Sequence, residues 1–340
     1  AMPLAAPVTL ARVADVLARH RCAFKFAATI EELAILLSRE QNRGSVGKFI
    51  TVYPPDDDAA VRIAEDLDRV TRGLPGPPIL SDRPLRAGSL VHYRYGVFSA
   101  RSLLGNDGSY ESRLTAPDGT RTPDTRNAWY SPPEWAACPF PSGTASARTS
   151  APEAVLLADR FVVRKALRHG SKGGVFLAED RAEGGQVVIK QARPYLGAML
   201  DGTDGRDLLR HEARMLDLFG PTGITARKVA LFETGGNVFL AQEYLTGTSL
   251  SAWVAANRPP HPDERWHDRA MGVARRLTDL VASVHRHGYV LRDLTPGNVM
   301  VLDDDDCRLI DLEMAAVPGE EVGRAYTLGY APPEQVKGPQ

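Results

Sequence analysis

The sequence predicts an α+β fold built from two successive domains. The chain has 340 residues, a length that favours two domains. Its first part alternates helical and short strand patterns, whereas the second part starts with strands and glycine turns and continues with longer helices. Between them, residues 139–157 are rich in Pro, Ser, Thr and Ala, which is typical of a linker. We therefore expect domains at 1–138 and 158–340, the second with an N-lobe at 158–247 and an incomplete C-lobe at 248–340.

Composition and charge exclude several classes of protein. The formal net charge is −1, which argues against a general polyanion binder, so we expect no nucleic-acid partner. No apolar run is long enough to span a bilayer and no signal peptide is visible, so we expect no membrane association. Cys22, Cys138 and Cys307 lie far apart in the sequence, which predicts neither a disulfide framework nor a zinc site. These features favour the cytoplasm.

The first domain is expected to contain three helices and three strands. Helical spacing predicts helices over 9–20, 29–37 and 56–72. Thr29 and Glu32 form a capping-box pattern at the start of the second helix. Period-two alternation predicts strands over 22–27, 48–53 and 90–98.

Cationic side chains recur on these predicted strands and their turns. Alternation places Lys25 on the face opposite Phe24 and Phe26, and it places Arg94 on the same face as His92. Cations held on rigid strands suit a phosphorylated substrate, and scattered surface charge is the simpler alternative. The candidate cations are Lys25, Arg43, Lys48, Arg94 and Arg101.

The second domain starts with three predicted strands and a glycine turn. The turn is His169-Gly-Ser-Lys-Gly-Gly174, in which Gly170, Gly173 and Gly174 let the backbone approach a ligand closely. The third strand ends at Lys190, and a helix over 207–218 carries Glu212. We expect Glu212 to pair with Lys190.

The strongest chemical signal is a stretch of polar residues after a long helix predicted over 269–287. Its sequence is Tyr289-Val-Leu-Arg-Asp-Leu-Thr-Pro-Gly-Asn-Val-Met300, and Leu309-Ile-Asp-Leu-Glu313 follows. Asp293 and Asn298 lie five residues apart, and Asp311 ends an apolar run. Phosphoryl transfer from ATP needs one carboxylate to orient the attacking hydroxyl, and an amide with a second carboxylate to hold Mg²⁺.

Taken in order, these motifs resemble protein kinases over residues 159–340. The resemblance implies that Asp293 orients or deprotonates the acceptor hydroxyl, and that Asn298 and Asp311 bind Mg²⁺. It also implies that the glycine turn and Lys190 bind the ATP phosphates. Backbone groups near Glu243 and Leu245 would hold the adenine.

The sequence departs from the usual kinase pattern in three places. Leu291 stands where His is usual, Thr295 where Lys is usual, and Leu312-Glu313 where Phe-Gly is usual. Residues 323–335 resemble the end of a kinase activation segment, with Thr327 near the acceptor loop. A kinase C-lobe normally continues further, so we expect this chain to be part of a longer protein.

Four motifs of the first domain carry a second resemblance. They are Ala23-Phe-Lys-Phe26, Arg43-Gly-Ser-Val-Gly-Lys-Phe-Ile-Thr-Val-Tyr-Pro54, Gly76-Pro-Pro-Ile-Leu-Ser-Asp82 and Tyr93-Arg-Tyr95. They resemble the lyase domain of class III and class IV lanthipeptide synthetases, which is similar to bacterial phosphothreonine lyases. Such lyases eliminate phosphate from phosphoserine or phosphothreonine and leave dehydroalanine or dehydrobutyrine. The order of lyase and then kinase is also the order in these synthetases.

This resemblance implies a peptide-modifying enzyme that phosphorylates Ser and Thr of a precursor peptide with ATP and Mg²⁺ and then eliminates the phosphate. Lys25 is the candidate base, because neighbouring cations disfavour its charged form. Lys48, Arg94, Arg43 and Arg101 are the candidates for binding the phosphate. A Lys-x-His element of the family, whose His protonates the leaving phosphate, would lie upstream of Ala1 or be absent. His92 is a possible substitute acid.

The family also has a C-terminal cyclase, which we expect downstream in the full protein. Class IV cyclases bind zinc and class III cyclases do not, so this portion leaves the class open, together with the precursor peptide and the oligomeric state. Two alternatives remain at this point. One is a pseudokinase used as a peptide-binding scaffold, and the other is a Ser/Thr signalling kinase with an unrelated N-terminal domain.

Overall fold

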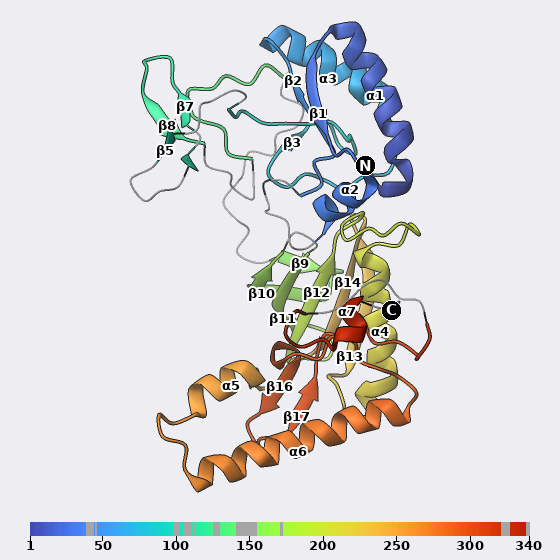
Figure 1. Cartoon of the computed structure of the whole chain (residues 1–340), viewed down its shortest axis with the longest axis vertical. Helices are drawn as coiled ribbons and strands as arrows, with labels where there is room; N and C mark the ends of the chain where they lie inside the picture. Colours follow the sequence, from blue (N-terminus) through green and yellow to red (C-terminus); the bar gives the residue numbers. More distant parts are fainter. Residues whose placement is uncertain are drawn as a thin grey trace. The chain divides into compact units, whose positions relative to one another are not determined.

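The chain divides into two compact units (Figure 1). The first unit is Ala1–Pro152 with Pro194–Asp204, and the second is Glu153–Arg193 with Gly205–Gln340. The computed structural model describes residues 1–38, 44, 46–97, 103–104, 110–111, 113–124, 130–140, 155–170, 173–320 and 327–337. Both units mix helices and strands, so the predicted α+β class is confirmed.

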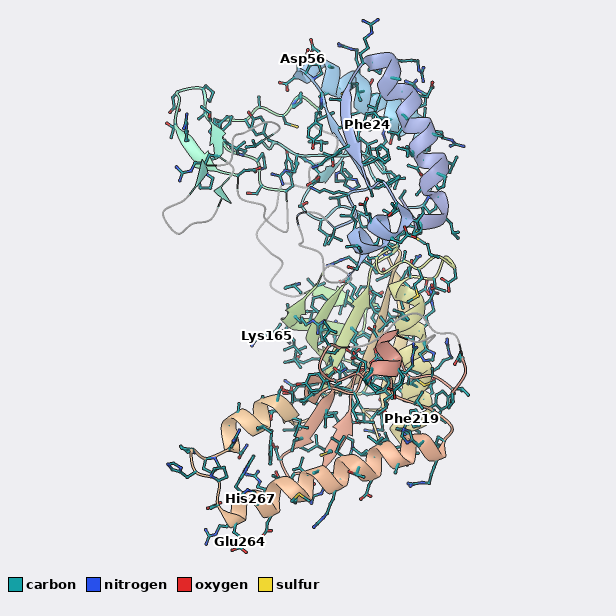
Figure 2. All side chains as sticks on the ribbon, viewed as in Figure 1. Phe24, Asp56, Lys165, Phe219, Glu264 and His267 are labelled. Carbon is teal, nitrogen blue, oxygen red and sulfur yellow. The ribbon has the colours of Figure 1, made fainter. Side chains whose placement is uncertain are left out.

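In the first unit, two helices and a strand pair enclose one apolar core. Helices α1 (Ala6–His20) and α3 (Asp57–Thr71) pack on the antiparallel pair β1 (Ala23–Phe26) and β2 (Ile50–Tyr53). Phe24 lies opposite Val52 in the register, and both pack with Leu17 and Ile63 (Figure 2). The alternation placed Phe24 and Phe26 on one face; Phe24 joins this core, whereas Phe26 is 44% exposed.

Helix α2 (Ile30–Leu37) belongs to a neighbouring core. It starts after Thr29, whose hydroxyl accepts a hydrogen bond of 3.1 Å from the Glu32 N–H, as the capping box predicts. Leu33 and Leu37 are fully buried, and Leu196 packs beside them with no exposed surface. The sequence had placed residues 194–204 in the second domain, but their apolar side chains complete the core of the first unit. A short helix, η1 (Pro3–Ala5), precedes α1.

The rest of the first unit contains short antiparallel pairs. They are β3 (Arg83–Pro84) with β4 (His92–Tyr93), β5 (Leu103–Leu104) with β6 (Tyr110–Glu111), and β7 (Arg113–Thr115) with β8 (Arg121–Pro123). The strand predicted over 90–98 is therefore too long. Between Arg94 and Val97, the described residues pair with no strand, and the Val97 N–H donates to Asp124 Oδ2 at 3.4 Å.

The second unit opens with an antiparallel six-stranded sheet in the order β13-β14-β12-β11-β10-β9. Its elements are β9 (Val155–Leu157), β10 (Phe161–His169), β11 (Gly174–Asp180), β12 (Gln186–Ala192), β13 (Lys228–Thr234) and β14 (Asn237–Glu243). Helix α4 (Gly205–Phe219) packs Leu209, Ala213 and Leu216 with Val238 and Leu240 of β14. The other face of the sheet buries a separate apolar cluster that includes Ile189 and Phe239.

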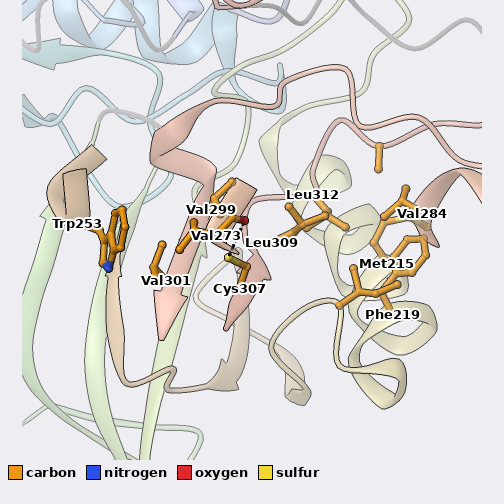
Figure 3. Close-up of a cluster of buried hydrophobic side chains, with 12 residues drawn as sticks. Met215, Phe219, Trp253, Val273, Val284, Val299, Val301, Cys307, Leu309 and Leu312 are labelled. Carbon is orange, nitrogen blue, oxygen red and sulfur yellow. Dashed lines mark hydrogen bonds between the residues drawn. The ribbon is translucent and has the colours of Figure 1, made fainter. Parts of the chain in front are cut away.

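The remaining elements follow, and several of them enclose a third apolar core together with the end of α4. They are η2 (Gly220–Thr222), β15 (Gly247–Ser249), α5 (Leu250–Asn257), α6 (Glu264–Arg286), η3 (Pro296–Asn298), β16 (Val299–Leu302), β17 (Cys307–Leu309) and α7 (Pro333–Lys337). Trp253, Val273, Val284 and Leu309 are among its buried members (Figure 3). Helix α6 starts earlier than predicted, because Asp263 caps the Trp266 N–H at 2.8 Å. Within the ranges described above, no helix is long and apolar enough to cross a membrane.

Candidate active site

Lys190 lies at the centre of a charged cluster in the second unit. Strand β12 carries it, and its Nζ lies 2.6 Å from Glu212 Oε1 of α4. The same Nζ lies 3.2 Å from Asp311 Oδ1, which follows β17. Three segments that are distant in sequence therefore bring together the cation and the two carboxylates that the kinase resemblance singled out.

Burial makes the electrostatics of this cluster strong. Glu212 is only 1% exposed, and its desolvation raises the pKa of its carboxyl to about 7 despite the charge of Lys190. Burial alone would lower the pKa of Lys190, but Asp311 and Glu212 outweigh it and hold that pKa above its ordinary value. Lys190 therefore keeps its positive charge at neutral pH, as a side chain that binds phosphate needs.

Asn298 and Asp311 end two neighbouring segments. Strand β16 pairs with β17, and just beyond this pair the Ile310 N–H donates to the Asn298 carbonyl at 2.9 Å. The side chains of Asn298 and Asp311 thus leave adjacent backbone positions. Leu312, where kinases usually have Phe, is 2% exposed and fills the core next to them.

The donor types of this pair fit Mg²⁺, which prefers carboxylate and amide oxygens and usually keeps substrate phosphates as further ligands. Among the described side chains, no group of three His, Cys, Asp or Glu residues could hold a metal ion alone. Both observations agree with a Mg²⁺ site in which the nucleotide phosphates supply the remaining ligands.

Asp293 lies in a loop that several hydrogen bonds fix. The Asn298 side chain donates to the Asp293 carbonyl at 2.9 Å, and the Thr327 hydroxyl donates to Asp293 Oδ1 at 2.7 Å. The Gln335 amide donates to the carbonyl of the preceding residue, Arg292, at 2.6 Å. Leu291 packs against the core of Figure 3, so an apolar side chain occupies the position of the usual histidine.

The glycine turn between β10 and β11 packs closely on β12. The Gly170 N–H donates to the Gly173 carbonyl at 2.8 Å and closes the turn. A Cβ on Gly173 would lie 1.6 Å from the backbone oxygen of Gln191, next to Lys190. A Cβ on Gly174 would lie 2.3 Å from the Phe176 ring. Packing thus requires glycine at position 173 even before any ligand is considered, whereas a larger residue at position 174 would displace the Phe176 ring.

Glu243 and Leu245, the residues predicted to hold the adenine, lie at the end of β14 and just after it. Glu243 ends β14, where its N–H donates to the Arg227 carbonyl at 2.9 Å. Leu245 follows in the connection between β14 and β15. Their contact with adenine remains a prediction.

In the first unit, Lys48 and Arg94 line one cavity of about 540 Å³. Lys48 Nζ lies 2.8 Å from Asp82 Oδ1, and Arg94 Nη2 lies 2.6 Å from Asp124 Oδ1. Both ion pairs are largely buried, so the carboxylates hold the two cations in fixed positions. Neither Asp82 nor Asp124 was predicted as a site residue. Asp82 ends a motif quoted above, whereas nothing in the sequence around Asp124 singled it out.

Of the other predicted cations of the first unit, the structure describes Lys25 and does not bring it to this cavity. Lys25 is exposed on β1, outside the cavity lining, with its Nζ 5.9 Å from the centroid of the Tyr53 ring. Arg43 and Arg101 lie outside the described residues.

His92 lines the cavity, but its ring serves the backbone. Nε2 accepts from the Ile79 N–H at 3.3 Å, and Nδ1 lies 3.2 Å from the Leu90 carbonyl, to which it donates. Burial lowers the pKa of His92. The structure therefore does not support His92 as the substitute acid.

The fold and the site define a protein kinase. Residues 161–340 match the family model of the protein kinase domain, and the chain belongs to this family. Residues 1–152 match a second model, described as RamC, N-terminal domain.

Known proteins are also similar to this chain. The chain is 35% identical over 324 residues to a probable SapB synthase of Streptomyces coelicolor, a match that covers 92% of this chain and 34% of that protein. It is 30% identical over 189 residues to the DNA damage-responsive serine/threonine-protein kinase RqkA of Deinococcus radiodurans, covering 54% of this chain and 27% of that kinase. Among solved structures, the kinase domain of PF14_0431 matches at 18% identity and a TM-score of 0.45, covering 55% of this chain and 61% of that chain.

The chain thus spans about a third of the synthase and about a quarter of the bacterial kinase. The synthase match and the two family models together confirm the predicted resemblance to lanthipeptide synthetases.

Proposed function

We propose that this chain is the lyase and kinase portion of a lanthipeptide synthetase. It transfers phosphate from ATP to Ser and Thr of a precursor peptide and then eliminates that phosphate to give dehydroalanine and dehydrobutyrine. The observation that carries this proposal is the Lys190–Glu212–Asp311 cluster, together with a synthase relative that matches both units.

In the kinase step, the charged groups have separate roles. Lys190, oriented by its 2.6 Å contact with Glu212, binds the nucleotide phosphates. Asp293 accepts the hydrogen bond of the attacking Ser or Thr hydroxyl and takes its proton. Asn298 and Asp311 are the residues that would hold Mg²⁺, which neutralises charge on the phosphates when bound.

The lyase step takes place in the first unit. A base removes the Cα proton, the Cβ–O bond breaks, and phosphate leaves as a Cα=Cβ double bond forms. Lys48 and Arg94 bind the phosphate dianion in the cavity that they share and stabilise it as it leaves. Lys25 remains the proposed base, and Arg43 and Arg101 remain proposed phosphate ligands. A cyclase downstream in the full protein would then join cysteine thiols to the dehydrated residues in the cytoplasm.

The test follows the mass of a Ser/Thr-containing precursor peptide incubated with the full-length protein, ATP and Mg²⁺. We expect wild type to give dehydrated peptide and Asp293→Asn to leave the peptide unmodified. Lys48→Ala and Lys25→Ala should accumulate phosphopeptide, because phosphorylation continues while elimination is impaired. The mass spectrum distinguishes phosphopeptide from dehydrated peptide. Lys165→Ala, an exposed lysine of β10, serves as the control and should behave as wild type.

Two results would change the assignment. If wild type adds no phosphate to a peptide that it demonstrably binds, a peptide-binding pseudokinase replaces the kinase proposal. If wild type and every lysine variant release phosphopeptide without dehydration, the chain acts as a kinase only.

A further inference from the structure

Several contacts in the first unit fix the guanidinium of Arg94. Its Nε donates to the Tyr95 carbonyl at 3.3 Å, and its Nη2 donates to Asp124 Oδ1 at 2.6 Å. The guanidinium also lies against Gly96, where an added Cβ would come within 2.9 Å of Nη2. The Arg94 side chain therefore folds back over the residues that follow it in the chain.

Asp124 supplies the charged contact in this arrangement. It directly follows β8, and its side chain is only 5% exposed. Its two oxygens have different partners, because Oδ1 accepts from Arg94 and Oδ2 accepts from the Val97 N–H at 3.4 Å. One carboxylate thus joins the guanidinium to the backbone three residues further along the chain.

Only one member of this ion pair faces the cavity of the first unit. Arg94 and Gly96 line that cavity, whereas Asp124 does not. Nε and Nη2 of Arg94 bond to described residues, and Nη1 bonds to none of them. A substrate in the cavity can therefore meet the guanidinium but not the carboxylate, and Nη1 is the nitrogen that remains for a phosphate oxygen.

We propose that Asp124 is a positioning residue that orients Arg94 toward the phosphate of a phosphoserine or phosphothreonine peptide. This inference rests on the proposed lyase function and adds a residue that acts on the substrate only through Arg94. A guanidinium binds phosphate through hydrogen bonds of fixed direction, so its orientation matters as well as its charge. Without Asp124, Arg94 would keep its charge and lose its direction.

The experiment separates binding from elimination by giving two peptides to the full-length protein without ATP. The first is a phosphoserine peptide, and mass spectrometry follows its conversion to the dehydroalanine peptide. The second is the phosphonate analogue, in which a CH₂ group replaces the bridging oxygen. Phosphate cannot leave this analogue, so calorimetry measures its affinity without turnover.

Asp124→Asn should lower both the affinity for the phosphonate peptide and the kcat of elimination about 10-fold. Asparagine has a single side-chain oxygen, so it cannot accept from Arg94 and from the Val97 N–H through separate oxygens. Phosphorylation with ATP should be unchanged. A variant that had merely lost stability would lose both activities together.

Asp118→Asn is the matched control. Asp118 is the exposed acid of the turn between β7 and β8, and its Oδ1 accepts from the Thr120 N–H at 2.8 Å. This variant should bind and convert the two peptides as wild type does.

Two further variants test whether Asp124 acts through Arg94. Gly96→Ala displaces the guanidinium and leaves Asp124 in place, so it should reduce affinity and elimination in the same way. In an Arg94→Lys protein, adding Asp124→Asn should cost no more than about a further 2-fold, because residues that act as a unit are not additive.

Three outcomes would overturn the inference. They are unchanged affinity and kcat in Asp124→Asn, a full additional loss when Asp124→Asn is added to Arg94→Lys, and a wild type that does not prefer the phosphonate peptide to the same peptide with serine. If Asp124→Asn does not fold, Gly96→Ala decides, and wild-type affinity in that variant would overturn the inference. The proposed function fails separately. A wild type that binds the phosphonate peptide in dependence on Asp124 but never converts the phosphoserine peptide contradicts the lyase proposal and leaves the role of Asp124 intact.

Discussion

The hydroxyl of Thr327 donates a hydrogen bond of 2.7 Å to Oδ1 of Asp293, a residue 34 positions earlier in the chain. The Asn298 amide donates to the Asp293 carbonyl at 2.9 Å and, more weakly, to Asp293 Oδ2 at 3.5 Å. The carboxylate that the kinase proposal assigns to the acceptor hydroxyl is therefore oriented by two polar side chains. A carboxylate in this role must keep its orientation, because the hydroxyl has to meet the same oxygen at each turnover.

Thr327→Val should reduce the rate of peptide phosphorylation. The substitution keeps the shape of the side chain and removes the donor to Asp293, so we expect kcat to fall about 10-fold. Thr327→Ser keeps the hydroxyl and should retain most of the activity. Thr327 is exposed, so neither change should alter the unfolding temperature. Steady-state kinetics of all three proteins checks this, and equal rates for Val and Ser would contradict it.

Lys190→Met should remove phosphoryl transfer while leaving peptide binding intact. The variant loses the cation that contacts Glu212 and Asp311, and with it the group proposed to bind the ATP phosphates. We expect a loss of about 100-fold or more in the phosphorylation rate. Lys228→Met is the control, because Lys228 pairs with Asp217 on the surface of the same unit. A Lys190→Met protein that phosphorylates the peptide as fast as the control would contradict the assignment of the site.

The sequence predicted the kinase cluster because its residues occur in motifs of fixed order. The strand that carries Lys190 is a short β-branched apolar run, and the helix that carries Glu212 has apolar residues at helical spacing, so the sequence predicted both elements. The carboxylates that hold Lys48 and Arg94 were not predictable in this way. Asp124 pairs with Arg94 across 30 residues of sequence, and no local pattern specifies such a pairing.

The sequence also did not predict that residues 194–204 belong to the first unit. This segment lies between β12 and α4 in the sequence, so order along the chain assigned it to the second domain. Its apolar residues instead find their partners, Leu33 and Leu37, in the first unit. Tertiary packing thus overrode the linear division of the chain.

Arg94→Lys should impair elimination more than phosphorylation. A lysine keeps the charge but loses the planar guanidinium that suits phosphate, so phosphopeptide should accumulate relative to dehydrated peptide. Arg94→Ala would also leave Asp124 without its cation, and the side chain of Asp124 is only 5% exposed, so this variant should unfold at a lower temperature. Arg164→Lys, at an exposed pair with Glu179, is the control. An unchanged product ratio for Arg94→Lys would contradict a role of Arg94 in the lyase step.

Leu196→Ala should destabilise the first unit although the residue follows β12 of the second. Leu196 has no exposed surface, and truncating a fully buried leucine typically costs about 2–5 kcal/mol. Leu200 lies in the same segment and is 60% exposed, so Leu200→Ala should have little effect. Urea unfolding measures the difference in stability between the two variants, and hydrogen exchange of the amides in α2 locates it. Equal protection of Leu33 and Leu37 amides in both variants would show that the segment does not support this core.

Asp180 should give the second unit a distinct sensitivity to acid. Two hydrogen bonds from Arg160, at 2.8 and 2.6 Å, lower the pKa of this buried carboxyl from 3.8 to about 2. Because the folded pKa is the lower one, the carboxylate stabilises the fold above about pH 4, and this contribution is lost as the pH falls toward 2. Asp180→Asn should therefore lower the free energy of unfolding by about 2 kcal/mol at pH 7.

The difference between wild type and Asp180→Asn should shrink as the pH falls, because wild type then carries a neutral side chain at this position as well. Urea unfolding at a series of pH values between 7 and 2 checks this expectation. Glu179→Gln is the matched control, since Glu179 is the adjacent acid on β11 but its ion pair with Arg164 is half exposed, where such pairs contribute little. A constant difference between Asp180→Asn and wild type across the whole pH range would indicate that shape, and not the charge of Asp180, stabilises this corner of the sheet.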